Sequence, residues 1–286
     1  MPRIVHINGE FLPLQAATLP LMDRGFLFGD AIYEVTAVIG GRLIDNDRHL
    51  ARLERSLAEI GIPLPRPLPE IERIQRHLVD ANGLEEGTVY MQVSRGVQER
   101  DFLPAAGLSP TFVAFTQQKQ LLDTAAQREG IAVDLQPDLR WMRRDIKTTM
   151  LLGQVLAKQA AQRAGYTDVW LHEDAVITEG ASASAFIIRG HTLVTRGNSR
   201  AILPGCTRAA VLKLIAEAGL VLEERGFTTA EAEAATEAFQ TSATSLVTPV
   251  VRIGQSRIGD GRPGPLTRRL QTLYLAEVST QPAPTN

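Results

Sequence analysis

Apolar residues recur along the first third of the chain with two different periods. Alternation with polar residues over short runs is typical of half-buried strands, whereas spacings of three and four residues are typical of helices. The Asn8-Gly9 pair marks a tight turn between the first two strand-like runs, and Asp47 stands where it can cap the first helix. In order, the patterns predict a hairpin over residues 4–12, a strand over 31–39 that resumes over 42–44, helices over 47–60 and 68–82, and strands over 88–94 and 111–117.

A polar stretch near the middle of the chain divides these elements from a second set. Beyond it, strands are expected over 131–135, 169–171, 185–188 and 239–241, with helices over 149–164 and 207–218. Gly165 and Gly219 stand where helix C-cap glycines belong. We therefore expect an α/β (α+β) protein of two domains, with a small N-terminal domain over 1–117, a linker over 118–130 and a larger C-terminal domain over 131–286. The final TQPAPTN is expected to be disordered.

Composition narrows the class of protein. Thirty basic and 32 acidic residues give a formal charge of −2, so no broad attraction to nucleic acid or to an anionic membrane is expected, and the partner should be a small molecule. Cys206 is the only cysteine, which excludes an internal disulfide framework and a cysteine-rich metal site and fits a reducing cytoplasm. We expect neither a secretion signal at the N-terminus nor a membrane-spanning run.

Lys147 lies at the end of an extended segment, just before a helical pattern. A lysine in such a place can be partly withdrawn from water, which favours the neutral amine that a Schiff base requires. The alternative is a solvated lysine at a helix start, which is the common state of lysines.

Three further segments carry candidate chemistry. Glu179 falls in a Gly/Ser-rich turn between strand-like runs, where its carboxylate could hold a pyridine nitrogen protonated, although the turn could equally be only polar. The glycine turn at Gly205 leads into a helix near Thr207, so backbone N–H groups and the Thr207 hydroxyl could bind phosphate. Thr207 could instead simply cap that helix. The hydroxyl-rich run 241–245 could add donors to the same phosphate.

The segment 259–264 formally matches the GxGxxG pattern of dinucleotide sites. Pro263 and Pro265 remove backbone donors that a pyrophosphate would need, and no full strand-to-helix unit with a downstream acid surrounds the segment. We therefore interpret it as a surface turn ahead of the C-terminal helix.

Taken together and in this order, these segments resemble the class IV aminotransferases, the fold-type-IV branch of pyridoxal 5′-phosphate (PLP) enzymes, and within them the D-amino-acid aminotransferases. The resemblance extends over nearly the whole chain. It is carried by the runs at 23–34, 48–53, 95–96, 145–147, 178–180, 205–208 and 241–244.

The resemblance implies a homodimer whose subunits hold PLP between a small and a larger lobe, with no metal. It implies that Lys147 forms the Schiff base and moves the substrate proton, while Glu179 pairs with the pyridine nitrogen. Leu203 would pack against the ring. Without the resemblance, Arg52 would be interpreted as a helix-surface salt-bridge residue. The phosphate ligands implied are Arg52, Cys206, Thr207 and Thr244.

The family's carboxylate trap is matched only in part. Tyr33 and Arg100 match a tyrosine and an arginine that grip the substrate carboxylate across the dimer interface, but the family's histidine is missing where this chain has Phe102. The expected reaction is ping-pong transfer of an amino group from a D-amino acid to pyruvate or 2-oxoglutarate. The alternatives are a branched-chain L-amino-acid aminotransferase, an (R)-amine transaminase, an aminodeoxychorismate lyase, or a non-catalytic binding protein on this scaffold. Arg24, Arg95 and Arg143 are alternative carboxylate ligands.

Overall fold

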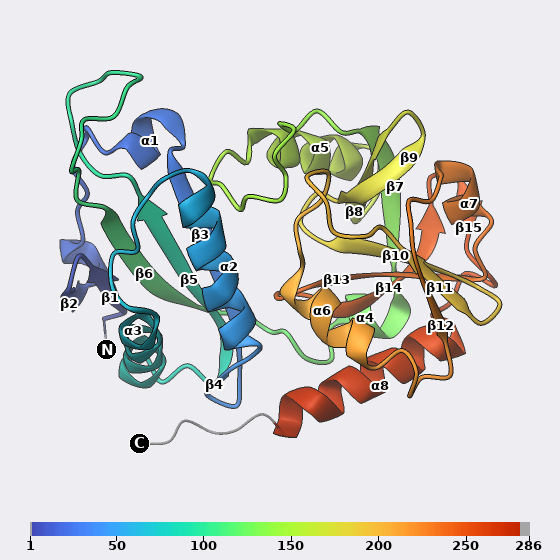
Figure 1. The fold of residues 1–286 in the computed structure, drawn as a ribbon. Helices are drawn as coiled ribbons and strands as arrows, with labels where there is room; N and C mark the ends of the chain where they lie inside the picture. Colours follow the sequence, from blue (N-terminus) through green and yellow to red (C-terminus); the bar gives the residue numbers. More distant parts are fainter. Residues whose placement is uncertain (1, 281–286) are drawn as a thin grey trace. The chain divides into compact units, whose positions relative to one another are not determined.

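A computed structural model describes residues 2–280, which form two compact units (Figure 1). The tail predicted to be disordered spans residues 280–286: Thr280 is the last residue of a helix, and residues 281–286 lie outside the described residues. The first unit comprises residues 2–121 and Ile146–Met150, and the second comprises Leu122–Asp145 and residues 151–280. The segment that contains Lys147 thus belongs to the first unit, although the sequence patterns assigned it to the C-terminal domain.

Backbone pairing explains where this short segment lies. Thr148 forms a bridge with Ile32, and the Tyr33 N–H donates to the Lys147 carbonyl at 3.0 Å. The Thr149 N–H donates to the carbonyl of Ala31 at 3.1 Å. Because these backbone groups are used by a strand, the helix predicted from residue 149 cannot begin there, and it begins at Leu152.

The first unit is a six-stranded antiparallel sheet with two helices on one face (Figure 1). The strand order is β2-β1-β6-β5-β3-β4. Leu53 and Leu57 of one helix and Ile71 and Leu78 of the other are at most 1% exposed and pack onto the sheet. The elements are β1 (Ile4–Ile7), β2 (Glu10–Pro13), a 3₁₀ turn (Leu14–Ala16), α1 (Arg24–Phe28), β3 (Ala31–Ile39), β4 (Arg42–Leu43), α2 (Asn46–Glu59), α3 (Leu68–Ala81), β5 (Glu86–Ser94) and β6 (Thr111–Gln118).

The second unit is built around a nine-stranded mixed sheet. Its main order is β12-β11-β10-β13-β14-β7-β8-β9, with β15 paired to β14, and Trp170, Ile187 and Val250 lie in its core. The elements are α4 (Ala125–Glu129), β7 (Ile131–Pro137), α5 (Leu152–Arg163), β8 (Asp168–Glu173), β9 (Val176–Gly180), β10 (Ser184–Arg189), β11 (Thr192–Thr195), α6 (Cys206–Lys213), β12 (Val221–Glu224), α7 (Thr229–Glu233), β13 (Glu237–Ser242), β14 (Leu246–Ile253), β15 (Ser256–Arg257) and α8 (Pro265–Thr280).

The α/β fold class is confirmed, and most predicted elements are found, with local corrections. The first hairpin turns at Asn8-Gly9, where both residues have positive φ. Asp47 was predicted to cap the first helix, but the N-cap is Asp45 in a left-handed conformation, with its carboxylate paired to Arg48. Residues 214–218, predicted as helix, lie beyond the end of α6.

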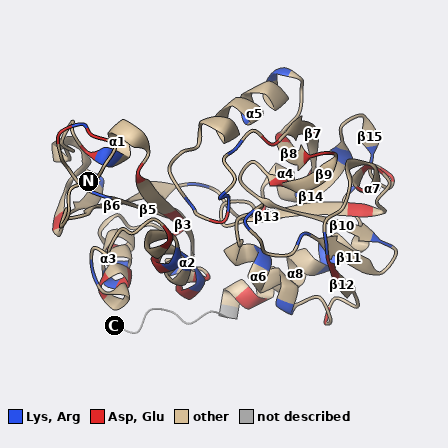
Figure 2. Ribbon diagram, turned by 45° about the horizontal axis from the view of Figure 1, so that its top comes forward, with Lys and Arg blue, Asp and Glu red and all other residues tan. Residues whose placement is uncertain are grey.

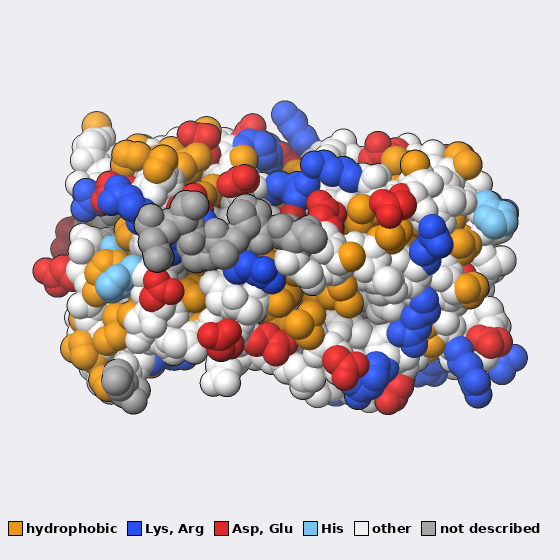
Figure 3. All heavy atoms as spheres, turned by 90° about the horizontal axis from the view of Figure 1, so that it is seen from below, with side chains coloured by type: hydrophobic (Ala, Val, Ile, Leu, Met, Phe, Trp, Pro, Cys, Tyr) orange, Lys and Arg blue, Asp and Glu red, His pale blue; other side chains and the backbone are white. Residues whose placement is uncertain are grey.

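Charged side chains of both signs are interspersed over the described residues. Figure 2 shows basic and acidic positions mixed along α2 and α3. On the face seen in Figure 3, blue and red side chains likewise alternate with orange ones. This distribution agrees with the near-balanced composition, which gives the molecule no large field of one sign.

Candidate active site

Lys147 and Tyr33 lie together in the first unit. The Lys147 Nζ is 4.2 Å from the centroid of the Tyr33 ring, and both side chains are half-buried. Tyr33 is stacked on Tyr90, which in turn stacks on Phe115, with ring centroids 5.7 and 4.8 Å apart. The Tyr33 ring, which this aromatic row holds in place, partly shields the Lys147 amine from water. The chemistry proposed for Lys147 needs such shielding.

Arg52 is held on α2 by a buried carboxylate that the sequence analysis did not identify. Its Nε and Nη2 donate to the two oxygens of Glu34 at 2.7 and 2.8 Å. His49 Nδ1 lies 2.7 Å from the same carboxylate. Burial alone would raise the pKa of Glu34, but the Arg52 guanidinium and His49 outweigh it and hold that pKa well below its usual range.

Arg24 binds the loop that carries Arg100. It is buried, and its Nε pairs with Asp30 at 2.8 Å. Its Nη1 and Nη2 donate to the backbone carbonyls of Asp101 and Phe102 at 2.6 and 3.1 Å. The loop therefore has a defined attachment to α1 despite the departure from the family pattern at Phe102.

Arg100 is exposed and faces aromatic rings. Its guanidinium carbon lies 5.4 Å from the Phe28 ring centroid and 5.6 Å from that of Phe102. The alternative carboxylate ligands are engaged elsewhere: Arg95 pairs with Asp30 at 2.7 Å, and Arg143 pairs with Asp145 at 3.0 Å.

Glu179 is buried in the second unit, at the end of β9 and not in the turn that the sequence predicted. One oxygen accepts from Arg140 Nη1 at 2.8 Å, and both lie 3.2 Å from the backbone nitrogen of Leu203. Burial raises the pKa of Glu179 above its usual value, and Arg140 and the Leu203 N–H only partly oppose that shift.

The turn after Leu203 leads into α6 with a close backbone approach. Gly205 is the N-cap, so the alternative in which Thr207 caps the helix is wrong. A Cβ on Gly205 would lie 2.7 Å from the Ser184 hydroxyl, so a side chain there would force Ser184 to move. Cys206 and Thr207 are buried in the first turn of α6, where backbone N–H groups have no intrahelical acceptor.

The hydroxyl-rich turn between β13 and β14 offers further donors. The Ser242 hydroxyl lies 2.8 Å from that of Ser245 and 3.4 Å from that of Thr244. The neighbouring Thr241 hydroxyl is buried and has no hydrogen-bond partner among the described residues. A buried hydroxyl without a partner and a glycine-lined helix start are features that a phosphate group would satisfy, so the residues present fit PLP.

The segment 259–264, which formally matches the dinucleotide pattern, precedes a helix whose N-terminus is already occupied. Beneath it, the Glu237 carboxylate accepts from the backbone N–H groups of Leu266 and Thr267 at 3.0 and 2.7 Å. A Cβ on Gly264 would lie 2.1 Å from Glu237. A carboxylate therefore already occupies the N-terminus of α8, which leaves no place for a pyrophosphate.

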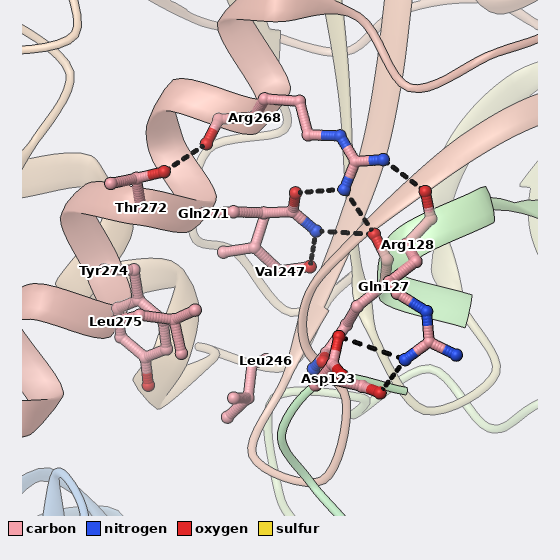
Figure 4. Close-up of a pocket in the computed structure, with 10 residues that line it drawn as sticks. All are labelled: Asp123, Gln127, Arg128, Leu246, Val247, Arg268, Gln271, Thr272, Tyr274 and Leu275. Atoms are coloured by element: carbon pink, nitrogen blue, oxygen red, sulfur yellow. Dashed lines mark hydrogen bonds and ion pairs between the residues drawn. The ribbon is translucent and has the colours of Figure 1, made fainter. Parts of the chain in front are cut away.

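A separate pocket of about 260 Å³ lies in the second unit between α4, the start of β14 and α8 (Figure 4). It contains none of the predicted site residues. Its polar groups are paired with one another: Asp123 with Arg128, and Arg268 with Gln271. Its remaining walls are mainly apolar, so they do not select a particular ligand.

The structure thus brings the predicted residues together in two sets. Tyr33 and Lys147 are neighbours in the first unit, which also contains Arg52 and Arg100. Glu179 and Leu203 are hydrogen-bonded in the second unit, whose turns also carry the following phosphate candidates: Cys206, Thr207 and Thr244. No local pattern in the sequence indicates the partners of the charged residues, which are Glu34, His49, Asp138 and Arg140.

Among residues 2–280, no helix is long and apolar enough to cross a membrane. In the same residues, no group of three or more His, Cys, Asp or Glu side chains could hold a metal ion.

Solved structures share this fold over almost the whole chain. A branched-chain amino acid aminotransferase from Escherichia coli matches with a TM-score of 0.92 at 22% identity, covering 97% of this chain and 95% of that one. A second branched-chain amino acid aminotransferase, solved with pyridoxamine 5′-phosphate, matches with a TM-score of 0.92 at 22% identity, covering 99% and 96%. The fold is therefore that of the fold-type-IV PLP enzymes.

Sequence comparison gives the family. The model of the amino-transferase class IV family matches residues 31–253. A D-alanine aminotransferase of Bacillus licheniformis is 38% identical over 281 residues, which are 98% of this chain and 99% of the relative. One of Staphylococcus aureus (strain N315) is 35% identical over 270 residues, or 93% and 95%. The chain belongs to the class IV aminotransferases, and its cofactor is PLP.

Proposed function

We propose that this aminotransferase acts on D-amino acids and passes their amino group to a 2-oxo acid such as pyruvate or 2-oxoglutarate in a ping-pong cycle. The observation that carries the proposal is the full-length similarity to D-alanine aminotransferases at 31–38% identity. The branched-chain enzymes match in fold at about 22% identity, which supports the architecture but not their substrates. The placement of Tyr33 beside Lys147 is consistent with a substrate site at this point.

The residues of each unit have the following proposed roles toward PLP. Arg52, Cys206, Thr207 and Thr244 would bind the phosphate, and Leu203 would pack against the ring. When bound, PLP withdraws electrons from the substrate Cα. The Lys147 Nζ would hold the cofactor covalently and then carry the proton removed from Cα. Glu179 would keep the pyridine nitrogen protonated.

Substrate orientation would depend on Tyr33 and Arg100. Arg24, Arg95 and Arg143 each pair with a carboxylate of the chain, which leaves Arg100 as the candidate best placed to receive another one. Phe102 is 76% exposed beside Arg100, where the family pattern has a histidine. A second donor is therefore absent from this trap, and this favours some activity on (R)-amines that lack a carboxylate.

We also propose that the enzyme is a cytoplasmic homodimer. Leu152, Val155 and Leu156 follow one another at helical spacing on α5, yet they are 46–70% exposed. An apolar helix face of this kind is typical of an interface. The single buried cysteine is consistent with a reducing compartment. Analytical ultracentrifugation at several concentrations would test the dimer.

A substrate panel tests the proposed reaction. D- and L-amino acids and (R)-amines would each be assayed with pyruvate and with 2-oxoglutarate, and kcat/KM would be compared. We expect D-alanine or another small D-amino acid to give the highest value. A preference for L-leucine or L-valine would contradict the proposal and favour the branched-chain alternative.

A further inference from the structure

Arg140 connects two buried carboxylates in the second unit. It follows β7, and its side chain is only 7% exposed. Its Nη1 donates to Glu179 at 2.8 Å, while its Nε and Nη2 donate to the two oxygens of Asp138 at 2.9 and 2.8 Å. The guanidinium thus forms two hydrogen bonds with Asp138 and one with Glu179.

Asp138 is itself fixed in place. The Thr178 hydroxyl donates to it at 2.7 Å, and Arg144 Nε lies 3.2 Å from the same oxygen. Thr178 directly precedes Glu179 on β9, so the anchor of Arg140 and the residue it reaches are tied to the same strand. Because a two-point arginine–carboxylate pair defines the plane of the guanidinium, this arrangement aims Nη1 at Glu179.

The neighbours of Glu179 have opposing effects on its charge. Burial and the nearby Asp138 both raise the pKa of Glu179, whereas Arg140 and the Leu203 N–H lower it. Without Arg140, the remaining forces mostly favour the neutral acid. A neutral carboxyl group would no longer stabilise a protonated pyridine nitrogen.

We propose that Arg140, anchored by Asp138, is a positioning residue that keeps Glu179 ionised and oriented toward the cofactor nitrogen. The inference rests on the proposed role of Glu179. Arg140 acts through Glu179 and does not itself take part in the reaction. A purely structural Arg140, which only ties β7 to β9, would affect stability but not the protonation of the cofactor.

The protonation state of the PLP ring nitrogen tests this role of Arg140 directly. The holoenzyme would be loaded with PLP labelled with ¹⁵N in the ring, and the ¹⁵N chemical shift would be recorded across pH for wild type, Arg140→Gln and Arg140→Lys. We expect a protonated nitrogen at neutral pH in wild type. Arg140→Gln, which removes the charge, should give the unprotonated shift, and Arg140→Lys should restore protonation at least in part.

Arg144→Gln is the matched control. It removes a guanidinium beside the same Asp138 but keeps the two-point Arg140–Asp138 pair and the Thr178 hydrogen bond, so the ¹⁵N shift should stay as in wild type. We further expect Arg140→Gln to lower kcat by about as much as Glu179→Gln does, with KM for the amino donor within about two-fold.

Glu179→Gln separates failure of this inference from failure of the proposed function. If Glu179→Gln loses nitrogen protonation and Arg140→Gln keeps it, Arg140 has no such role, whereas Glu179 retains its own. If Glu179→Gln also keeps it, the proposed role of Glu179 is wrong, and the inference falls with it. Should Arg140→Gln fail to fold, Arg140→Met, which also removes the charge but keeps an apolar side chain of similar length, takes its place, and a protonated nitrogen in that variant overturns the role of Arg140.

Discussion

Glu34 in the first unit and Glu179 in the second are both buried glutamates that face an arginine. The surrounding donors stabilise the ionised form of Glu34 more than that of Glu179. Glu34 takes two donors from Arg52 and lies against His49, and its pKa is lowered. Glu179 takes one donor from Arg140 and a backbone N–H, and its pKa is raised. Burial disfavours the charge in both, so the donors around each carboxylate, together with the nearby Asp138 at Glu179, decide the direction of the pKa shift.

The opposite pKa shifts suit the two carboxylates to different roles: a structural one for Glu34 and the proposed chemical one for Glu179. Glu34 accepts two hydrogen bonds from Arg52 and so fixes the orientation of this proposed phosphate ligand. The charge of Glu179 is incompletely matched, because Arg140 is shared with Asp138. Such a carboxylate gains from another donor, and a protonated pyridine nitrogen would supply one.

The largest effect on stability is expected for Glu34→Gln. The substitution removes the buried charge that pairs with the Arg52 guanidinium, which should lower the free energy of unfolding by about 3–5 kcal/mol. Urea denaturation of the cofactor-free protein would measure the loss, with Glu179→Gln as the matched variant. The comparison fails if both variants lose the same stability.

Glu179→Gln should act chiefly on catalysis. The amide can still accept a hydrogen bond but cannot stabilise a cationic nitrogen, and the loss of a charged hydrogen bond of about 1.5–3 kcal/mol corresponds to a roughly 10–100-fold lower kcat. The Kd for PLP, measured by fluorescence titration, should change less. Unchanged kcat with normal cofactor content would remove Glu179 from the mechanism.

Arg100→Ala extends the comparison to an arginine that faces aromatic rings and not a carboxylate. If Arg100 binds the substrate carboxylate, kcat/KM for D-alanine should fall about 10–100-fold, since a charge-assisted contact is worth about 1.5–3 kcal/mol. For an aromatic (R)-amine, which has no carboxylate, the loss should be much smaller. Equal losses for both substrates, or none for D-alanine, would exclude Arg100 as the ligand.

The smallest effect is a difference in how stability depends on pH. The lowered pKa of Glu34 stabilises the fold above its ordinary value of 4.5, and this contribution is lost as the pH falls below that value. The raised pKa of Glu179 has the opposite sign: its contribution is full below 4.5 and is lost as the pH rises through the folded pKa.

Unfolding free energies from about pH 3 to about pH 7 would show the two signs. Relative to wild type, Glu34→Gln should lose less stability on acidification. Glu179→Gln should lose less as the pH rises through the folded pKa. Parallel curves for all three proteins would show that the two carboxylates do not differ in the folded state.

The sequence predicted the fold class because helices and strands depend on local patterns, whereas the role of Lys147 follows from the family resemblance and stays a prediction. Periodicity identified β3 and α2, and a lysine between an extended segment and a helix stood out by its place in the order. The long-range pairing of the Lys147 segment with β3 has no local signal. Its assignment to the first unit therefore became apparent only in three dimensions.

The role of Arg140 could not be read from the sequence, because its segment reverses the usual pattern. Leu139 and Met142 are 86% and 83% exposed, whereas Arg140 and Arg144 are turned inward to carboxylates. A rule that places apolar residues inside and arginines outside gives the wrong faces here. The partners that decide the orientation, Asp138 and Glu179, are brought together only by the pairing of β7, β8 and β9.

The most direct test of the account is to find which lysine holds the cofactor. The protein, expected to be yellow as purified, would be reduced with borohydride, digested and analysed by peptide mass spectrometry, with Lys147→Ala as the control. We expect the reduced adduct on Lys147, and in Lys147→Ala no adduct and a loss of turnover of about 10³-fold or more with the fold intact. An adduct on another lysine, or ordinary turnover in Lys147→Ala, would contradict the assignment.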